Sequence, residues 1–500
     1  MTRTPAPDAP LGRVDTMLAS AGTGKTHGLV GAIEEAVAGG LDPARLLATT
    51  FTNRAADELA ARIRERLVAR GRADAASAML GARIGTVNGV CGELLREFAL
   101  ELGRSPVAEV IPEERLDTLF ARAVAPVMAD FEHLGELAER FGMADARGRS
   151  RFGGAGWRDD VRKIAALARL NGIAADGLAD AARRSLDGLL ALLPAAAPGE
   201  TAASLDDDLD AALAGCRADL TVARRAALKK TSMGSAEAVD RAHQARRRGE
   251  ALDWPTWARL AKLAPAKADA DLFLGVIEAA AAHPRHPRLR ADLAAFVEGQ
   301  FACAAACLPA FAAFKAANGL VDFVDQEELA LRVLRADAHR ERLAEAIGAV
   351  YVDEYQDSSP IQVALFAALA RCAPASVWVG DPKQSIYRFR DADPALTTET
   401  ARRITHDTGG ATTTLRRSWR SRPGIVALVN AAFTPHFTRL GASEDEVAFD
   451  RAQRADPPDV PPALAVWDVA ARSAPDRALA LAGAIAGMLA RPADWPVEPK

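Results

Sequence analysis

The stretch that decides the fold is Ala19-Ser20-Ala21-Gly22-Thr23-Gly24-Lys25-Thr26, whose pattern indicates a phosphate-binding loop between a short strand and a helix. Its glycines let the backbone turn so that successive N–H groups face a phosphate, and the dipole of the following helix favours the same negative charge. In this interpretation Lys25 reaches the β- and γ-phosphates of a nucleotide, and the Thr26 hydroxyl ligates Mg²⁺. Ala19 stands where the pattern usually has Gly. The alternative is a Gly-rich turn that Thr26 caps, with Lys25 in solvent.

Length and composition indicate a globular protein of several domains. Five hundred residues exceed one hydrophobic core, and the apolar and charged contents of 49% and 26% are ordinary for a folded chain. The net charge of −4 predicts that any nucleic acid is held by local basic surface. Residues 1–10 lack the apolar core of a signal peptide, and the apolar run 478–490 is too short to span a bilayer. We therefore expect a cytoplasmic protein with no membrane partner.

The five cysteines form no C-x-x-C pair, which fits a reducing compartment. Cys303 and Cys307 lie four residues apart and so share one helix face. We expect them to be buried as small apolar side chains rather than to ligate a metal.

Two strand-to-helix turns carry residues that suit contacts with nucleic acid. Thr49-Thr50-Phe51-Thr52-Asn53 precedes a helix that continues to Leu67, and residues 84–91 lead into a helix over 92–102. Ligands of α/β sheets bind at the carboxyl ends of the strands. Phe51 can therefore stack on a base, or it is the last core residue of its strand. Asn88 can bind a phosphate or sugar oxygen, or it is a helix cap.

The segment Ala349-Val350-Tyr351-Val352-Asp353-Glu354-Tyr355-Gln356-Asp357 predicts an apolar strand that ends in two adjacent carboxylates. A phosphate-binding loop needs such a partner, because a carboxylate can hold Mg²⁺ and hydrolysis needs a base for the attacking water. We assign Asp353 to Mg²⁺ and Glu354 to the base. An acidic turn after a buried strand is the alternative.

Two later motifs follow predicted strands. The first is Gly380-Asp381-Pro382-Lys383-Gln384-Ser385-Ile386-Tyr387-Arg388-Phe389-Arg390. In it Gln384 is suited to sense a γ-phosphate, and Tyr387 and Phe389 alternate with arginines as in a platform for a single strand. The second is Arg416-Arg417-Ser418-Trp419-Arg420-Ser421-Arg422-Pro423-Gly424, which opens a helix. An arginine at such a helix start can reach a phosphate across a cleft.

Between about 105 and 301 the sequence changes to helices rich in Ala, Arg and Leu, which predicts an inserted helical domain. A basic stretch within it contains Arg224, Arg225, Lys229, Lys230, Arg241, Arg246, Arg247 and Arg248. This stretch either contacts a phosphate backbone or forms a solvated helix face.

These motifs, in this order, resemble those of the superfamily-one helicases of the UvrD/Rep type, and GDPKQSIYRFR with SWRSRPGIV is most similar to the RecB/AddA helicase–nuclease branch. The resemblance covers residues 19–430, although the helical insertion matches in position only. It implies ATP and Mg²⁺ as cofactors and single-stranded DNA and DNA duplex ends as partners. It also implies 3′-to-5′ translocation by two RecA-like lobes and, as a further partner, a nuclease or a second motor subunit.

The resemblance also implies roles at the matching positions. The residues for nucleotide and metal are those of the loop 19–26, with Lys25 and Thr26 on phosphate and Mg²⁺ and Asp353 on Mg²⁺. Those for catalysis are Glu354 as the base, Gln384 as the γ-phosphate sensor and Arg420 as a charge stabiliser from the second lobe. Those for single-stranded DNA are Phe51, Asn88, Tyr387 and Phe389.

The chain departs from the family in four places. Residues 1–18 contain no Gln to read adenine, Asn88 stands where many relatives have His, and Asp391 replaces a Gly and adds a charge beside the DNA platform. The sequence stops at Lys500, before the last motor motifs and any nuclease domain. We therefore expect a fragment of a longer protein. If these residues are all that is made, we expect nucleotide to bind but coupled hydrolysis and unwinding to be poor.

The predicted fold class is α/β: a RecA-like P-loop NTPase lobe with a large helical insertion and the start of a second RecA-like lobe. The expected domains are residues 1–104 and 306–407 for the first lobe, 105–305 for the helical insertion and 408–500 for the incomplete second lobe. The predicted function is an ATP-dependent DNA helicase in DNA repair or recombination. The alternatives are the motor part of an end-resection helicase–nuclease and a nucleotide-binding protein without motor activity.

Overall fold

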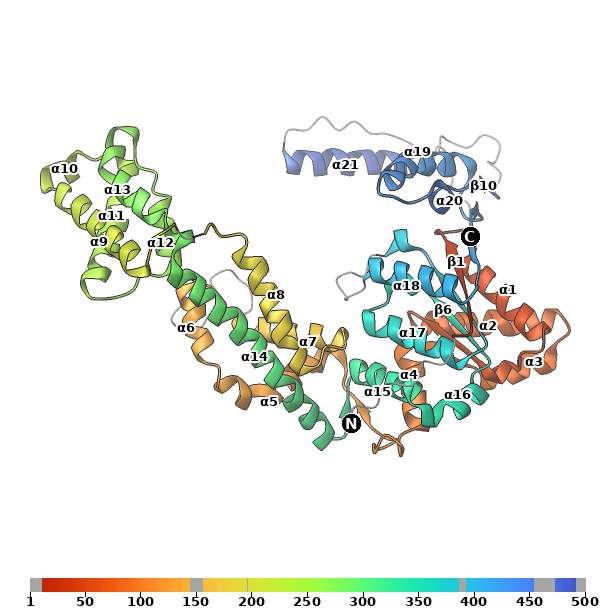
Figure 1. Ribbon diagram of the computed structural model, residues 1–500. Coiled ribbons are helices and arrows are strands. Elements are labelled where there is room, and N and C mark those ends of the chain that lie inside the picture. Colours follow the sequence, from red (N-terminus) through yellow and green to blue (C-terminus); the bar gives the residue numbers. More distant parts are fainter. Residues whose placement is uncertain (1–10, 144–155, 196, 386–392, 454–472, 492–500) are drawn as a thin grey trace. The chain divides into compact units, whose positions relative to one another are not determined.

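The computed structural model describes residues 11–143, 156–195, 197–385, 393–453 and 473–491. The chain divides into an α/β unit, residues 1–107 with 325–500, and a helical unit, residues 108–324 (Figure 1). Predictions for Tyr387, Phe389 and Asp391, for the N-terminal tail 1–10 and for a strand near 463–469 lie outside the described residues.

The α/β unit is built on a six-stranded sheet in the order β3-β2-β6-β7-β1-β8, and every neighbouring pair is parallel. The strands are β1 (Arg13–Ala19), β2 (Leu46–Thr50), β3 (Arg83–Thr86), β6 (Ala349–Asp353), β7 (Ala375–Gly380) and β8 (Thr412–Leu415). β2 is buried at all five residues, as expected for a strand covered on both faces. Because the strands are parallel, their carboxyl ends meet at one edge of the sheet.

Helices cover both faces of this sheet, and each face has its own apolar core. One layer contains α1 (Lys25–Ala38), α2 (Asn53–Ala69) and α3 (Ala73–Ala78). The other contains α4 (Val87–Glu97), α15 (Phe323–Arg335), α16 (Arg340–Ala346), α17 (Pro360–Cys372) and α18 (Pro394–Asp407). Successive residues of β6 serve opposite cores, since Ala349 and Tyr351 face the first layer and Val350 and Val352 the second.

The remaining elements of the α/β unit follow β8. They are the two-stranded sheet of β9 (Arg417–Ser418) and β10 (Arg451–Ala452), with α19 (Pro423–Arg439), α20 (Glu444–Val447) and α21 (Ala474–Leu489). Short 3₁₀ turns in this unit are Pro43–Arg45, Met79–Gly81, Asp337–His339, Tyr355–Asp357 and Pro382–Gln384.

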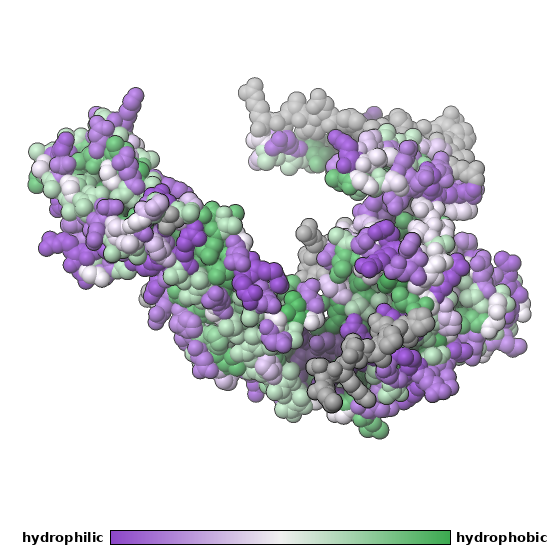
Figure 2. Space-filling view, in the orientation of Figure 1, coloured by the Kyte–Doolittle hydropathy of each residue, from purple (hydrophilic) through white to green (hydrophobic). Residues whose placement is uncertain are grey.

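The helical unit has two apolar cores that share one long helix. The first core is formed by α5 (Glu113–Ala129), α6 (His133–Arg140), α7 (Trp157–Leu170), α8 (Leu178–Leu190) and α14 (Pro287–Ala317). The second involves α9 (Ala202–Asp219), α11 (Lys230–Arg247), α12 (Trp254–Ala261) and α13 (Ala270–Ala280). The unit also contains α10 (Val222–Ala227) and the parallel pair β4 (Glu109–Val110) and β5 (Leu320–Val321). In the view of Figure 2, the surface of these helices is mostly hydrophilic and carries separate apolar patches.

α14 is the one helix of the described residues that is long and apolar enough to cross a membrane, judged by length and composition alone. Its Phe296, Cys303, Cys307 and Phe311 are buried in the first core of the helical unit. Lys315 of α14 is also buried, and its ammonium donates to the Asp322 carboxylate at 2.8 Å. These contacts identify α14 as a core helix. The prediction that Cys303 and Cys307 are buried is confirmed.

The predicted α/β fold class is confirmed, but three details differ. The helix after β3 begins at Val87 rather than at 92, because the Thr86 hydroxyl accepts the Gly89 N–H and starts it earlier. The expected boundary between 305 and 306 falls inside α14, an uninterrupted run of 31 residues. β8, inside the range expected to start a second lobe, is the sixth strand of the main sheet, since its run of Thr residues pairs with β1.

Candidate nucleotide-binding site

The candidate residues gather at the carboxyl edge of the parallel sheet. The loop 19–26 follows β1, Asp353 and Glu354 follow β6, and the turn that contains Gln384 follows β7. β7 lies between β6 and β1 in the sheet, so only one strand separates the end of β1, which carries the loop, from the end of β6, which carries the two carboxylates. Three segments that are far apart in sequence therefore form one site.

The loop has the conformation that phosphate binding requires. Gly22 and Gly24 have φ angles of 80° and 87°, in the left-handed region that favours glycine. The Thr23 hydroxyl donates to the Ser20 carbonyl at 2.7 Å and so closes the turn. α1 begins at Lys25 with Gly24 as its N-cap, so Thr26 is not the cap. This geometry contradicts the alternative of a Thr-capped turn.

Lys25 points into the site rather than into solvent. Its side chain is 14% exposed, and its ammonium forms an ion pair with the Glu354 carboxylate. Glu354 has φ 54°, and it is the only non-glycine residue with a positive φ among those that the structure describes. A left-handed conformation costs a non-glycine residue roughly 1–2 kcal/mol. The fold holds Glu354 in this conformation at the point where β6 ends and its side chain meets Lys25, which is the kind of place where strained residues tend to be functional.

Burial and the Glu354 charge raise the pKa of Asp353 to about 6, despite the opposing charge of Lys25. The pKa of Asp357 is raised as well, by burial and then by Glu354. Asp353 also accepts the backbone N–H of Glu354 at 3.0 Å, which orients its carboxylate. The site therefore concentrates negative charge around one lysine, a condition that favours a bound cation.

The residues at this edge of the sheet fit a Mg²⁺ ion whose ligands come partly from the protein and partly from a bound phosphate. Among the described residues, no cluster of three or more His, Cys, Asp or Glu side chains could hold a metal without other help. Mg²⁺ is usually bound by one or two carboxylates together with substrate phosphates and water. Asp353 and the Thr26 hydroxyl supply oxygen ligands of the required kind.

The turn after β7 holds Gln384 close to this charge. The Gln384 amide donates to the Asp381 carboxylate, which also pairs with Lys383 at 2.8 Å. Asp381 is 1% exposed, so the turn is anchored from inside the fold. Gln384 itself is half-buried and next to the site, as a sensor of bound phosphate would need to be.

The segment after β8 covers the phosphate-binding loop. The backbone N–H of Trp419 donates to the Gly22 carbonyl at 2.8 Å. A Cβ placed on Gly22 would lie 2.8 Å from the Cβ of Arg420. A Cβ at Gly24 would lie 3.4 Å from the Trp419 ring, which is 53% exposed. Arg420 therefore lies beside the loop. Trp419 was missed, and the only signal for it was an aromatic residue directly before the candidate arginine.

The structure excludes one of the two interpretations for each of Phe51 and Asn88. Phe51 follows the last residue of β2 and is 37% exposed, so it is not a core residue of the strand. Asn88 lies in the first turn of α4, where Thr86 is the N-cap, so the cap interpretation of Asn88 is wrong. The Asn88 Oδ1 is buried and has no hydrogen-bond partner among the described residues.

The basic stretch of the helical unit is largely neutralised by carboxylates. Arg225 pairs with Asp240 and Arg246 with Asp210, each at 2.7 Å. Similar pairs involve Arg224 with Asp219, Arg241 with Glu237 and Arg248 with Glu250. These contacts favour the solvated helix face over a phosphate-binding surface.

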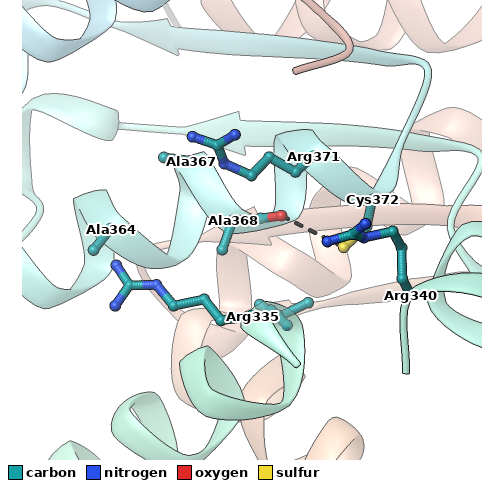
Figure 3. A pocket seen from close by; sticks show the side chains of 8 residues that line it. Arg335, Arg340, Ala364, Ala367, Ala368, Arg371 and Cys372 are labelled. Atoms are coloured by element: carbon teal, nitrogen blue, oxygen red, sulfur yellow. Dashed lines mark hydrogen bonds between the residues drawn. The ribbon is translucent and has the colours of Figure 1, made fainter. Parts of the chain in front are cut away.

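A cavity of about 310 Å³ lies away from these residues, between α15, α16 and α17 (Figure 3). It is lined by Leu334, Arg335, Arg340, Ala364, Ala367, Ala368, Arg371 and Cys372. Arg335 and Arg371 stand in the last turns of α15 and α17, where a cation is favoured by the helix dipole. None of the candidate site residues lines this cavity, so it is distinct from the nucleotide-binding site.

Comparison with known proteins matches the sequence of this chain to one family. A family model of the UvrD/REP helicase N-terminal domain matches residues 6–405. A segment of 159 residues, 29% of the chain, is 38% identical to an ATP-dependent helicase/nuclease subunit from Desulforudis audaxviator, and covers 13% of that protein. The proteins of the same name from Staphylococcus carnosus and Moorella thermoacetica are 34% and 37% identical over 28% and 30% of the chain, and 12% of each relative is covered.

The aligned segments thus span about an eighth of the length of these relatives. The family model, in contrast, covers four-fifths of the chain and includes the loop, the two carboxylates and the turn after β7. The chain therefore belongs to the UvrD/REP helicase family, to whose N-terminal domain these residues correspond.

Proposed function

We propose that this chain is the motor of an ATP-dependent DNA helicase that acts in DNA repair or recombination. The observation that carries the proposal is the meeting of Lys25, Asp353, Glu354 and Gln384 at one edge of the sheet, beside a loop with two left-handed glycines. Membership of the UvrD/REP family supports it. The arrangement has the parts that nucleotide hydrolysis requires: a phosphate cradle, a carboxylate for Mg²⁺, a base and a polar sensor.

ATP and Mg²⁺ are the proposed ligands. The backbone N–H groups of residues 19–26 bind the phosphates, Lys25 neutralises them, and Thr26 and Asp353 hold Mg²⁺. Mg²⁺ supplies charge neutralisation at the phosphate oxygens when it is bound. The Trp419 ring over Gly24 offers an apolar surface at the mouth of the site, in a chain that has no Gln upstream of the loop.

The ion pair between Lys25 and Glu354 suggests how binding prepares hydrolysis. Without phosphate, each group neutralises the other inside a partly buried site. When phosphate oxygens occupy the loop, Lys25 exchanges its carboxylate partner for them. Glu354 is then free to take a proton from the attacking water, while Gln384 and Arg420 contact the phosphate that is transferred. Nucleotide binding thus releases the base.

The proposed DNA contacts are those of Phe51, Asn88, Tyr387 and Phe389 with a single strand. The exposure of Phe51 at the carboxyl edge of the sheet supports stacking on a base. We further propose 3′-to-5′ movement, action on duplex ends and a cytoplasmic location. The proposed division is a RecA-like first lobe whose sheet includes β8, a helical insertion at residues 108–324 rather than 105–305, and the start of a second lobe after β8 rather than at 408.

The test is ATP hydrolysis by this chain with and without single-stranded DNA, beside two variants. Lys25→Ala should weaken nucleotide binding by at least about tenfold, because hydrogen bonds to a charged group contribute about 1.5–3 kcal/mol. Glu354→Gln should bind nucleotide and lose about 10²–10⁴-fold in turnover, as expected for loss of a general base. Full DNA-stimulated turnover by Glu354→Gln would refute the assignment of the base. Nucleotide binding by this chain without DNA-stimulated hydrolysis would mean that the activity needs motor motifs that these residues lack. The absence of DNA-stimulated hydrolysis in the native protein would favour a nucleotide-binding protein without motor activity.

A second candidate is the motor part of an end-resection helicase–nuclease, which would work with a nuclease or a second motor subunit. It is favoured by the name of the relatives, which are ATP-dependent helicase/nuclease subunits. Copurification of a nuclease activity with the native full-length protein would support it, and a native protein that unwinds duplex ends without any nuclease would argue against it.

A further inference from the structure

Gln356 connects the candidate base to the turn that contains the candidate phosphate sensor. Its amide Nε2 donates to the Glu354 Oε2 at 2.8 Å and to the Asp357 carboxylate at 3.1 Å. Its Oε1 accepts the backbone N–H of Asp381 at 2.9 Å, and its backbone carbonyl accepts the Ser385 hydroxyl at 3.2 Å. One side chain thus joins the end of β6 to the turn after β7.

The chemistry of the site requires an amide at this position. Carboxylates are acceptors and the Asp381 N–H is a donor, so the connecting side chain must donate at one end of its head group and accept at the other. The opposite amide orientation would place Oε1 against two carboxylates and Nε2 against an N–H. Gln356 is 1% exposed, so water cannot replace a lost contact without rearrangement.

Packing leaves little freedom for this side chain. A Cβ at Gly380 would lie 2.4 Å from the Gln356 Oε1 and 2.6 Å from the Tyr355 ring. The absence of a side chain at Gly380 therefore makes room for the glutamine head group. The amide is fixed by packing on one side and by hydrogen bonds at both ends.

We propose that Gln356 is a positioning residue for hydrolysis, which holds the Glu354 carboxylate at the end of β6 and fixes it relative to the turn Asp381–Gln384. The inference rests on the proposed function for its catalytic consequence. Lys25 and Gln356 share the Glu354 Oε2. Once Lys25 turns to phosphate, the Gln356 amide still holds this carboxylate. Gln356 does not touch the reacting atoms, and it acts through Glu354.

The first test compares Gln356→Met with Gln362→Met in DNA-stimulated ATP hydrolysis. Methionine keeps the length and volume of the side chain and removes donor and acceptor. Gln362 is a matched control, because its amide donates to the Glu327 carboxylate at 2.7 Å and its Oε1 accepts the Ser359 N–H at 3.1 Å, away from the site. Gln356→Met should lower kcat about 10- to 100-fold with KM for ATP within about threefold, and Gln362→Met should leave both unchanged. An unchanged kcat for a folded Gln356→Met protein would overturn the inference.

A second measurement does not depend on activity. A double-mutant cycle of Gln356→Met and Glu354→Ala, read as shifts of the thermal unfolding midpoint without nucleotide, should be non-additive, since each change removes the same contact. Additive shifts would overturn the inference. If the native protein hydrolyses no ATP, the proposed function fails, and the cycle alone then decides whether Gln356 holds Glu354.

Discussion

The raised pKa of Asp353 leads to a prediction about the stability of the α/β unit. Burial and the neighbouring Glu354 charge raise this pKa from 3.8 to about 6, so the folded protein keeps a proton that the unfolded chain has lost. The contribution of Asp353 to the free energy of unfolding must then fall as pH rises from about 4 to about 6, and the full penalty from this group remains above pH 6. A difference between 3.8 and about 6 corresponds to about 3 kcal/mol.

Asp353→Asn removes this penalty and keeps an oxygen that can accept the Glu354 N–H. The variant should therefore be more stable than the wild type by about 3 kcal/mol at pH 7.5 and by only about 1 kcal/mol at pH 4.5. The assay is urea unfolding of both proteins across this range, in the absence of nucleotide and Mg²⁺. Groups that titrate alike in both proteins cancel in the difference.

Asp57 provides the control, since it is exposed on α2 in the same unit. Asp57→Asn should change the free energy of unfolding by less than about 0.5 kcal/mol at every pH. The reasoning would be refuted if the difference between Asp353→Asn and the wild type did not depend on pH, or if it decreased as pH rises. Either result would mean that Asp353 is ionised at no cost in the folded protein.

Three further outcomes are expected. Gly22→Ala should reduce nucleotide affinity at least about tenfold and destabilise the loop by roughly 1–2 kcal/mol, because φ is 80° and the new Cβ would meet Arg420. A variant that binds nucleotide as tightly as the wild type in calorimetry would contradict this. Phe51→Ala should weaken single-stranded DNA binding by about 1–3 kcal/mol at fixed salt with little change in the unfolding midpoint, and unaltered affinity would show that the ring does not stack on a base. Asp322→Asn should destabilise the helical unit by about 3–5 kcal/mol in urea unfolding, because it removes the buried negative charge that pairs with both Lys315 and Arg169. A loss below about 1 kcal/mol would count against this account.

The alternation of strands and helices could be predicted because it depends on local patterns. The loop 19–26, the carboxylates after β6 and the turn after β7 each follow an apolar run that ends in polar residues. A parallel sheet then brings their carboxyl ends to one edge whatever the strand order. The sequence was therefore sufficient to bring Lys25 and Glu354 into one site, although their ion pair joins residues 329 positions apart.

The strand order and the details of the site could not be predicted, because they depend on contacts that are distant in sequence. Nothing local indicates that β8 pairs with β1 rather than with a later strand. The left-handed backbone of Glu354 is imposed by its surroundings, since glutamate has no preference for it. Likewise Gln356 appears in the sequence as one polar residue in an acidic turn, and its link to Asp381 exists only in the folded sheet.

The close approach of three carboxylates destabilises the site in the absence of a ligand. Asp353, Glu354 and Asp357 meet within one turn, and the pKa values of Asp353 and Asp357 are both raised. In the described structure this charge is opposed by Lys25 and by the Gln356 amide. A site that is destabilised in this way gains most from a ligand that brings its own cation, because the cation relieves the repulsion between the carboxylates while the phosphates take Lys25. In the proposed function, part of the binding energy of a Mg²⁺-nucleotide would therefore come from relief of the repulsion between these carboxylates. Gln356 would keep Glu354 in place while Lys25 exchanges its carboxylate partner for phosphate.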